Sequence, residues 1–142
     1  MSRPKITFAA PTVDSENAGE LAAFYARLLG WNKVYEDARY VIISPVEDGT
    51  PIIFQTVEIY EKPVWPWQKG TQGPMAHLDF NVENLEEAAQ YAMECGATRS
   101  SEPPSGTLAV MIDPAGHPFC LVRPPDASPL AEALSSNEST NQ

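Results

Sequence analysis

The sequence contains one pattern of predicted elements twice, and this repeat constrains the fold more than any other feature. In each half, an apolar stretch typical of a strand precedes a helical segment. The first helix is expected between Asn17 and Gly30, and the second between Asn84 and Gly96. Each starts with an asparagine cap, has a glutamate three residues later, and ends at a glycine. Such a repeat indicates tandem duplication of one supersecondary unit.

Strand-like segments follow both helices in the same number and order. They are apolar or alternating stretches bounded by turn residues. In the first half they are expected at 33–36, 40–44 and 52–57, after an opening strand at 6–14. In the second half they are expected at 97–100, 107–112 and 119–123, after an opening strand at 76–82. Each half is therefore a β-α-β-β-β unit, and the whole chain is predicted to be α+β. Because a four-stranded sheet with one helix leaves a bare face, the two halves are expected to pair and to enclose a cleft.

These elements divide the chain into four parts. We expect a first module at 1–60, a connecting loop at 61–75, a second module at 76–123 and a tail at 124–142. The loop is rich in proline and glycine, which favours irregular structure. The tail is rich in proline, serine and asparagine and is expected to be flexible.

Charge and composition exclude several functions. The formal net charge is −10 and only 9 lysines and arginines are present, which disfavours nucleic-acid and anionic-membrane partners. No apolar stretch is long enough to span a membrane, and the first residues do not form a signal peptide. Cys95 and Cys120 match no disulfide framework. The expected location is the cytoplasm.

Three stretches resemble the vicinal oxygen chelate superfamily, which includes glyoxalase I, bleomycin-resistance proteins and extradiol dioxygenases. They are AAFYARLLGW, AHLDFNV followed by NLEEAAQYAMECGA, and DPAGHPFCLV. The resemblance covers residues 5–123 and is strongest to glyoxalase-like domain proteins. It implies two tandem βαβββ modules that form a cupped mixed β-sheet, the glyoxalase/bleomycin-resistance/dioxygenase fold. It also implies a homodimer.

Catalytic members of the superfamily bind a metal through the first and last strands of each module. By this resemblance the ligand positions fall on Ala10, Gln55, His77 and Cys120. Ala10, found by counting seven residues back from the helix cap as for His77, has no donor atom. The neighbouring Pro11 cannot substitute for it, and Thr12 would be a poor ligand. Because both carboxylates are missing, we expect no resident cofactor. Zinc or a similar divalent ion, bound by His77, Gln55 and Cys120, is the alternative.

The missing carboxylates also affect the expected reaction. Glyoxalase-type isomerisation needs a carboxylate base beside a metal-bound carbonyl, and Gln55 and Cys120 occupy those positions. Ring cleavage needs two histidines and a carboxylate, whereas the only other histidine, His117, is expected in a turn. Whether the chain is an enzyme stays open. A glyoxalase-like lyase or isomerase is favoured over a ring-cleaving dioxygenase.

Three further side chains are candidates for ligand binding. Asp79 lies two residues after His77, on the same strand face, where it could orient His77, line the cleft or face solvent. Trp65 and Trp67 could stack on an aromatic ligand over the cleft or pack on the outside of a module. For Cys120, the other interpretation is a small core hydrophobe.

The sequence leaves three hypotheses for function. In the first, the chain binds a small molecule, aromatic or cationic, in the cleft without the standard metal site. In the second, it is a metal-dependent glyoxalase-like lyase or isomerase that uses the altered ligand set. In the third, it is a structural or regulatory module without chemistry.

Overall fold

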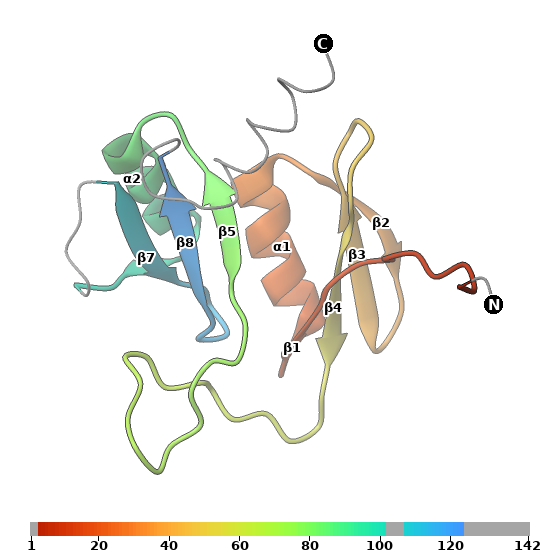
Figure 1. Ribbon diagram of the computed structural model, residues 1–142, viewed down its shortest axis with the longest axis horizontal. Coiled ribbons are helices and arrows are strands. Elements are labelled where there is room, and N and C mark those ends of the chain that lie inside the picture. Colours follow the sequence, from red (N-terminus) through yellow and green to blue (C-terminus); the bar gives the residue numbers. More distant parts are fainter. Residues whose placement is uncertain (1–2, 102–106, 124–142) are drawn as a thin grey trace. The chain divides into compact units, whose positions relative to one another are not determined.

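The structure is a computed structural model that describes residues 3–101 and 107–123. In these residues the chain forms two helices and eight strands (Figure 1). The chain divides into two compact units, Met1–Tyr60 and Glu61–Gln142, which we call unit 1 and unit 2. The tail predicted at 124–142 lies outside the described residues. Neither helix has the length and apolar composition needed to cross a membrane.

Unit 1 has one helix and a four-stranded mixed sheet. Its elements are β1 (Thr12–Ser15), α1 (Ala18–Leu29), β2 (Asn32–Glu36), β3 (Tyr40–Ser44) and β4 (Ile52–Thr56). The strand order is β1-β4-β3-β2, with β1 parallel to β4 and the other neighbours antiparallel. This is the predicted βαβββ arrangement.

The opening strand of unit 1 is shorter than the sequence predicts. The alternation suggests a strand at 6–14, but β1 begins at Thr12, and Ile6 and Phe8 are 79% and 76% exposed. Pro11 explains why the hydrogen-bonded ladder does not extend further toward the N-terminus. Its carbonyl accepts a hydrogen bond from Ile53 N at 3.0 Å, but proline has no N–H with which to continue the pairing.

The core of unit 1 lies between α1 and one face of the sheet. Leu21 and Tyr25 of α1 are buried with Ile43 and Phe54 of the strands, and the rings of Tyr25 and Phe54 stack with centroids 5.5 Å apart. The helix begins at the Asn17 cap, as predicted. Packing on this face alone leaves the opposite side chains of the sheet, including those of β4, outside this core.

Unit 2 repeats the arrangement. Its elements are β5 (Leu78–Asn81), α2 (Leu85–Cys95), β6 (Thr98–Arg99), β7 (Leu108–Ile112) and β8 (Pro118–Val122). The strand order β5-β8-β7-β6 matches that of unit 1, again with one parallel pair, β5 and β8. The predicted α+β class with two tandem βαβββ modules is therefore confirmed.

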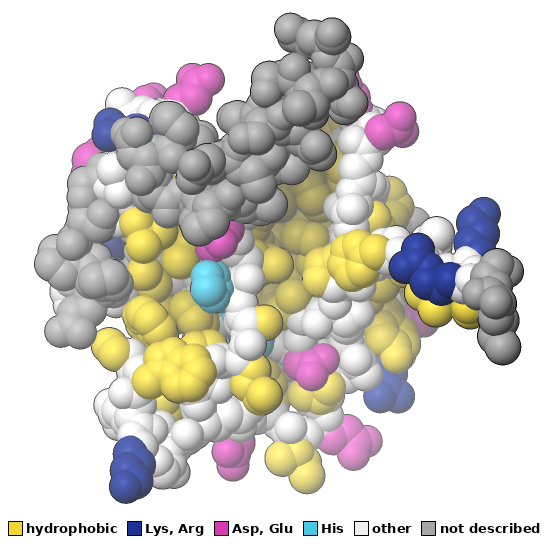
Figure 2. Space-filling view, in the orientation of Figure 1, with side chains coloured by type: hydrophobic (Ala, Val, Ile, Leu, Met, Phe, Trp, Pro, Cys, Tyr) yellow, Lys and Arg dark blue, Asp and Glu magenta, His cyan; other side chains and the backbone are white. Residues whose placement is uncertain are grey.

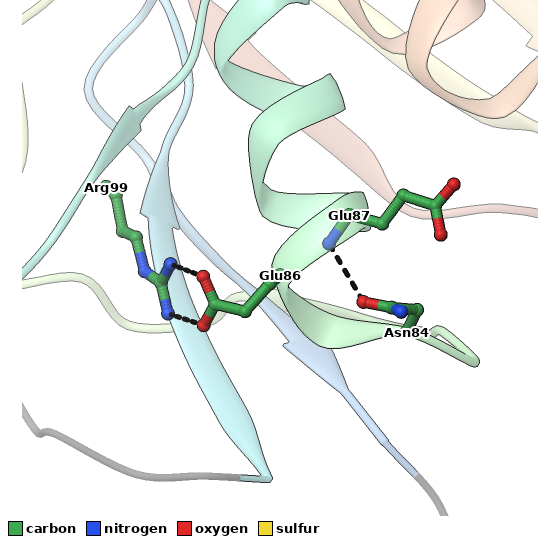
Figure 3. Close-up of polar contacts among 4 residues, drawn as sticks. All are labelled: Asn84, Glu86, Glu87 and Arg99. Carbon is green, nitrogen blue, oxygen red and sulfur yellow. Dashed lines mark hydrogen bonds and ion pairs between the residues drawn. The ribbon is translucent and has the colours of Figure 1, made fainter.

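Polar contacts fix α2 to the sheet of unit 2 (Figure 3). Asn84 Oδ1 accepts a hydrogen bond from Glu87 N at 3.0 Å and caps the helix. Arg99 of β6 donates from both terminal nitrogens to the Glu86 carboxylate, at 2.8 and 3.0 Å. Arg99 therefore points toward α2, and alternation along the strand turns the next residue, Ser100, to the opposite face.

The same alternation divides the side chains of β7 and β8 between two environments. Met111, Phe119 and Leu121 are almost fully buried and lie on the face that packs against α2. Val110 and Cys120 belong to the other face, which we call the far face of unit 2.

The turn between β7 and β8 is built around one buried carboxylate. Asp113 is only 4% exposed, and its Oδ1 accepts hydrogen bonds from Ala115 N at 2.9 Å and His117 N at 3.0 Å. His117 O in turn accepts from Asp113 N, which closes the hairpin. His117 therefore lies in the turn, as predicted.

Candidate functional site

The far face of unit 2 has an apolar centre. Val110, Cys120 and Val122 form a buried cluster against which Trp65 and Leu108 pack. In Figure 2, apolar side chains gather over β7 and β8, with a histidine and an acidic side chain beside them toward β5. The sheet thus presents an apolar surface that borders on ionisable groups.

Trp65 is anchored on this surface. Its indole Nε1 donates a hydrogen bond to Ser100 Oγ at 3.3 Å, and the ring packs against the apolar cluster. Trp67 lies elsewhere: it is 65% exposed and packs on Gly73, where a Cβ would be 3.0 Å from Trp67 Cε3. The two tryptophans lie in the same loop but have different environments, and of the two only Trp65 belongs to the far face.

Three candidate residues come together at the border of the apolar cluster. His77 directly precedes β5, Asp79 lies on β5, and Cys120 lies on β8. β5 and β8 are parallel, and their register places Asp79 opposite Cys120. His77 lies two residues before Asp79 and so projects to the same face. His77 Nε2 is 3.1 Å from Asp79 Oδ1, and the ligand atoms of all three residues lie within 4.8 Å of one another. We call this group the His77–Asp79–Cys120 cluster.

The environment of Cys120 suppresses its ionisation. Burial, followed by the negative charge of Asp79 and a hydrogen bond to its carboxylate, raises the pKa of the thiol to about 11. Near neutral pH the side chain is therefore a neutral thiol that donates to Asp79. Because the thiolate is the nucleophilic form, Cys120 is not suited to covalent catalysis in this state.

The cluster also offers the donor types of a zinc site. An imidazole nitrogen, a carboxylate oxygen and a thiolate sulfur are all zinc ligands, and three protein ligands leave a position for a substrate or water. Zinc would have to displace the Cys120 proton. The raised pKa of the thiol opposes this displacement, and the positive charge of the ion favours it. By donor chemistry the residues fit zinc, with Asp79 in the set.

Gln55 has a different environment from the one expected of a metal ligand. It lies on β4 of unit 1, where its Cα partners are Asp14 on β1 and Tyr40 on β3. With the amide oriented to satisfy both groups, the Gln55 oxygen accepts hydrogen bonds from Arg39 Nη2 at 2.8 Å and Nε at 3.0 Å. Sequence reasoning missed Arg39, because only the pairing of β3 with β4 reveals this contact.

The strand register also changes which residue of unit 1 corresponds to His77. Cys120 pairs with Asp79, and the equivalent pair in unit 1 is Gln55 with Asp14. The counterpart of His77, two residues earlier on the strand, is therefore Thr12.

Counting back from the helix cap gives Ala10 instead, and Ala10 lies before β1. The two counts differ because the connection from strand to helix is shorter in unit 1. Asn17 follows Asp14 by three residues, whereas Asn84 follows Asp79 by five. The hydroxyl of Thr12 is still a weak donor, so the position in unit 1 lacks a strong ligand under either count.

The fold and the site define the class of protein. Two tandem βαβββ modules, with ionisable residues on the first and last strands of a sheet, give the chain the fold of the glyoxalase/bleomycin resistance/dioxygenase proteins. More particularly, residues 10–122 match the family described as the glyoxalase-like domain, and the chain belongs to that family. No curated protein matches the sequence.

Solved structures share the fold at low sequence identity. A glyoxalase/bleomycin resistance protein/dioxygenase family enzyme from Burkholderia phytofirmans PsJN is 16% identical over 81% of this chain and 96% of its own, with a TM-score of 0.62. The fosfomycin resistance protein FosX from Listeria monocytogenes is 13% identical over 91% and 99%, with a TM-score of 0.65. TnmS3, an antibiotic binding protein from Streptomyces sp. CB03234, is 14% identical over 87% and 100%, with a TM-score of 0.58.

Proposed function

We propose that the chain binds a small planar aromatic cation on the far face of unit 2 and needs no resident metal to do so. The observation that carries this proposal is the position of the Asp79 carboxylate, whose side chain is 45% exposed, beside the apolar cluster that packs against Trp65. An apolar surface with one adjacent charge suits a ligand that has a flat body and a positive centre.

Each group has a distinct role in this proposal. The Trp65 ring, held by Ser100, offers a rigid surface for stacking. Asp79 supplies the negative charge, and His77 is a positioning residue that contacts one carboxylate oxygen. Cys120, kept neutral, adds apolar surface without a second charge.

The charge of the whole chain supports a cationic ligand, and a structural neighbour supports the binding of a small molecule. The formal net charge of −10 attracts cations and repels anions at long range. TnmS3, which shares the fold, is described as an antibiotic binding protein. This fold can therefore serve binding of a small molecule.

The test uses N-methylquinolinium as the probe and uncharged quinoline as its neutral counterpart. Tryptophan fluorescence or calorimetry measures binding to the full chain. We expect saturable binding of the cation, at least about tenfold tighter than that of quinoline. Asp79→Asn should remove most of this preference, whereas Glu87→Gln, which removes an exposed carboxylate from α2, should preserve it.

Two tryptophan variants complete the design. Trp65→Leu should weaken binding by about tenfold, while Trp67→Leu should leave it within about twofold. Equal losses in both variants, or equal affinity for the two probes, would contradict the proposal. Circular dichroism confirms that each variant is folded.

A second candidate function is a metal-dependent glyoxalase-like lyase or isomerase. It is favoured by the ligand atoms of His77, Asp79 and Cys120 lying within 4.8 Å of one another. A bound zinc ion would polarise a substrate carbonyl. Because Asp79 would then be a ligand, the base for proton transfer would have to come from another residue or from the substrate.

Metal analysis distinguishes the two candidates. Chain purified without chelator should contain little zinc if the first proposal holds. Zinc near one equivalent that is lost in His77→Ala, together with binding of N-methylquinolinium only to the metal-free form, would favour the second.

A further inference from the structure

Arg39 is held in a fixed position on unit 1. One edge of its guanidinium, formed by Nε and Nη2, donates to the amide oxygen of Gln55 at 3.0 and 2.8 Å. The guanidinium carbon also lies over the ring of Tyr40, 5.7 Å from its centroid. A hydrogen-bonded edge and an aromatic ring together restrict the side chain more than an exposed arginine is usually restricted.

The positive charge of Arg39 is not neutralised by an ion pair in the described part of the chain. The ion pairs found there involve Lys33, His77 and Arg99. The nearest acid in sequence, Asp37, is committed to its own turn, because its Oδ1 accepts from the backbone nitrogens of Arg39 and Tyr40 at 2.8 and 2.7 Å. Its Oδ2 accepts from the hydroxyl of Tyr35 at 2.6 Å.

The guanidinium retains the donors that recognise oxyanions. Arginine has five N–H donors in a planar fork, and the contact with Gln55 uses those on one edge. The outer edge, with one N–H from each terminal nitrogen, presents two parallel donors that can bind a carboxylate or a phosphate in a bidentate manner. With its oxygen turned to Arg39, the Gln55 amide nitrogen faces acceptor groups, so the donors for an anion come from Arg39 and Gln55 holds the fork in position.

We propose that Arg39 and Gln55 form a subsite on unit 1 for an oxyanion group, a carboxylate or a phosphate. This goes beyond the proposed function, because it lies in the other unit and takes the opposite charge. It also assigns Gln55 a different role: the residue orients a cationic donor instead of binding a metal.

Two features set the expected strength of this subsite. Asp14 is the Cα partner of Gln55 and its side chain projects to the same face, so its charge opposes binding of an anion. The net charge of −10 acts in the same direction. A simple anion should therefore bind weakly, and Asp14→Asn should strengthen the binding.

The experiment follows the NMR signals of the Arg39 Nε–H and the Gln55 side-chain amide in the full chain. The probes are inorganic phosphate and acetate, each compared with chloride at equal ionic strength. We expect saturable shifts with at least one of the two oxyanions. Tighter binding of phosphate would assign the subsite to phosphate groups, and tighter binding of acetate would assign it to carboxylates.

Three variants make the test specific. Arg39→Gln should weaken binding by at least about tenfold, judged by the Gln55 amide signals. Arg27→Gln, which removes the same charge from α1, should retain the affinity of the wild type. Gln55→Glu should abolish binding, because the new carboxylate would pair with Arg39 and occupy its fork.

The inference is overturned by any of three results. These are shifts that do not saturate and match those with chloride, an equal loss of affinity in Arg39→Gln and Arg27→Gln, or undiminished binding in Gln55→Glu. Since the probes and signals differ from those of the cation site on unit 2, each proposal can fail independently of the other.

Discussion

At the residue scale, Cys120 shows how neighbours determine the chemistry of a side chain. The resemblance places a metal-binding carboxylate at this position, and the chain has a thiol there instead. Its partner across the parallel strands, Asp79, is an acid, and together with burial this acid raises the pKa of the thiol to about 11. The substitution thus replaces a charged ligand by a neutral donor.

The reactivity of Cys120 tests this account. In a Cys95→Ser background, which leaves one cysteine, the thiolate fraction at about pH 8 should be on the order of one in a thousand. Asp79→Asn removes the charge that opposes ionisation, so the pKa should fall toward the ordinary value of 9.0 while burial keeps it higher. The rate of iodoacetamide alkylation at mildly alkaline pH should therefore rise several-fold.

The control for this measurement is Glu87→Gln. It removes an exposed carboxylate of α2, which packs on the opposite face of the sheet from Cys120, and should leave the alkylation rate unchanged. An unchanged or slower rate in Asp79→Asn would show that the carboxylate does not suppress the thiolate.

The same pKa shift predicts a dependence of stability on pH. The folded chain holds the Cys120 proton more tightly than the unfolded chain, whose thiol has an ordinary pKa of 9.0. The resulting stabilisation is fully present below pH 9 and is lost as the pH rises toward 11. Because Asp79 is half-exposed, solvent screens part of its effect on the thiol. We therefore expect a loss of about 1–2 kcal/mol in the free energy of unfolding.

Denaturant unfolding at about pH 8 and about pH 11 measures this loss, and Cys120→Ala should show a smaller decrease between the two pH values. Tyr35, whose pKa is raised by its hydrogen bond to Asp37, is present in both proteins, so any contribution it makes cancels in the comparison. Equal decreases in the two proteins would contradict the assignment to Cys120.

Residue-level prediction succeeded or failed according to whether local sequence fixes the neighbours. Alternation along one strand places Asp79 beside His77, and the structure shows that contact. No local pattern distinguishes Trp65 from Trp67, because Trp65 is held by Ser100 and by the apolar cluster on the far face of unit 2, both distant in sequence. Arg39 was missed for the same reason: its partner Gln55 is distant in sequence and adjacent only through strand pairing.

At the element scale, the helices could be predicted closely and the first strand could not. α1 and α2 carry their own start and stop residues, Asn17 and Gly30 or Asn84 and Gly96, and the structure follows them. A strand has no such local signals, since it extends only as far as its neighbour can bond to it. The apolar alternation at 6–14 therefore overestimates β1.

The asparagine caps give a prediction at this scale. Asn17 Oδ1 accepts from Glu20 N at 3.0 Å, and Asn84 makes the same contact with Glu87 N. Asn17→Ala and Asn84→Ala should each lower the free energy of unfolding by about 1 kcal/mol, because one backbone donor loses its partner.

Chemical denaturation measures these losses, and Asn17→Gly and Asn84→Gly are the matched controls. Glycine should cost only a few tenths of a kcal/mol, because it leaves the helix terminus open to water. If neither alanine variant were less stable than the wild type, the capping contacts would not contribute to stability.

At the scale of the whole molecule, the duplicated architecture is the part that the sequence predicts best. Both units have the same strand order and the same parallel pairing of first and last strands. The residues at matching positions have diverged: Gln55 bonds Arg39 in unit 1, while Cys120 joins His77 and Asp79 in unit 2. The joined cupped sheet, the homodimer and the cytoplasmic location stay predictions, and sedimentation of the purified chain tests the homodimer.

The net charge of the molecule gives the last prediction. A chain with a formal charge of −10 attracts a cationic ligand from all sides, and Asp79 adds a local contribution. Salt screens both, since the screening length falls from about 10 Å at 0.1 M to about 3 Å at 1 M. The affinity for N-methylquinolinium should therefore fall several-fold as salt is raised over this range, whereas that for quinoline should change little.

Asp79→Asn separates the two contributions, because it removes the local charge and leaves most of the net charge in place. Its residual binding of the cation should be weaker at every salt concentration and should depend less steeply on salt than that of the wild type. Calorimetric titration measures both quantities. A salt dependence equal for the cation and for quinoline would mean that charge does not contribute to recognition, and the apolar cluster with Trp65 would then account for binding by itself.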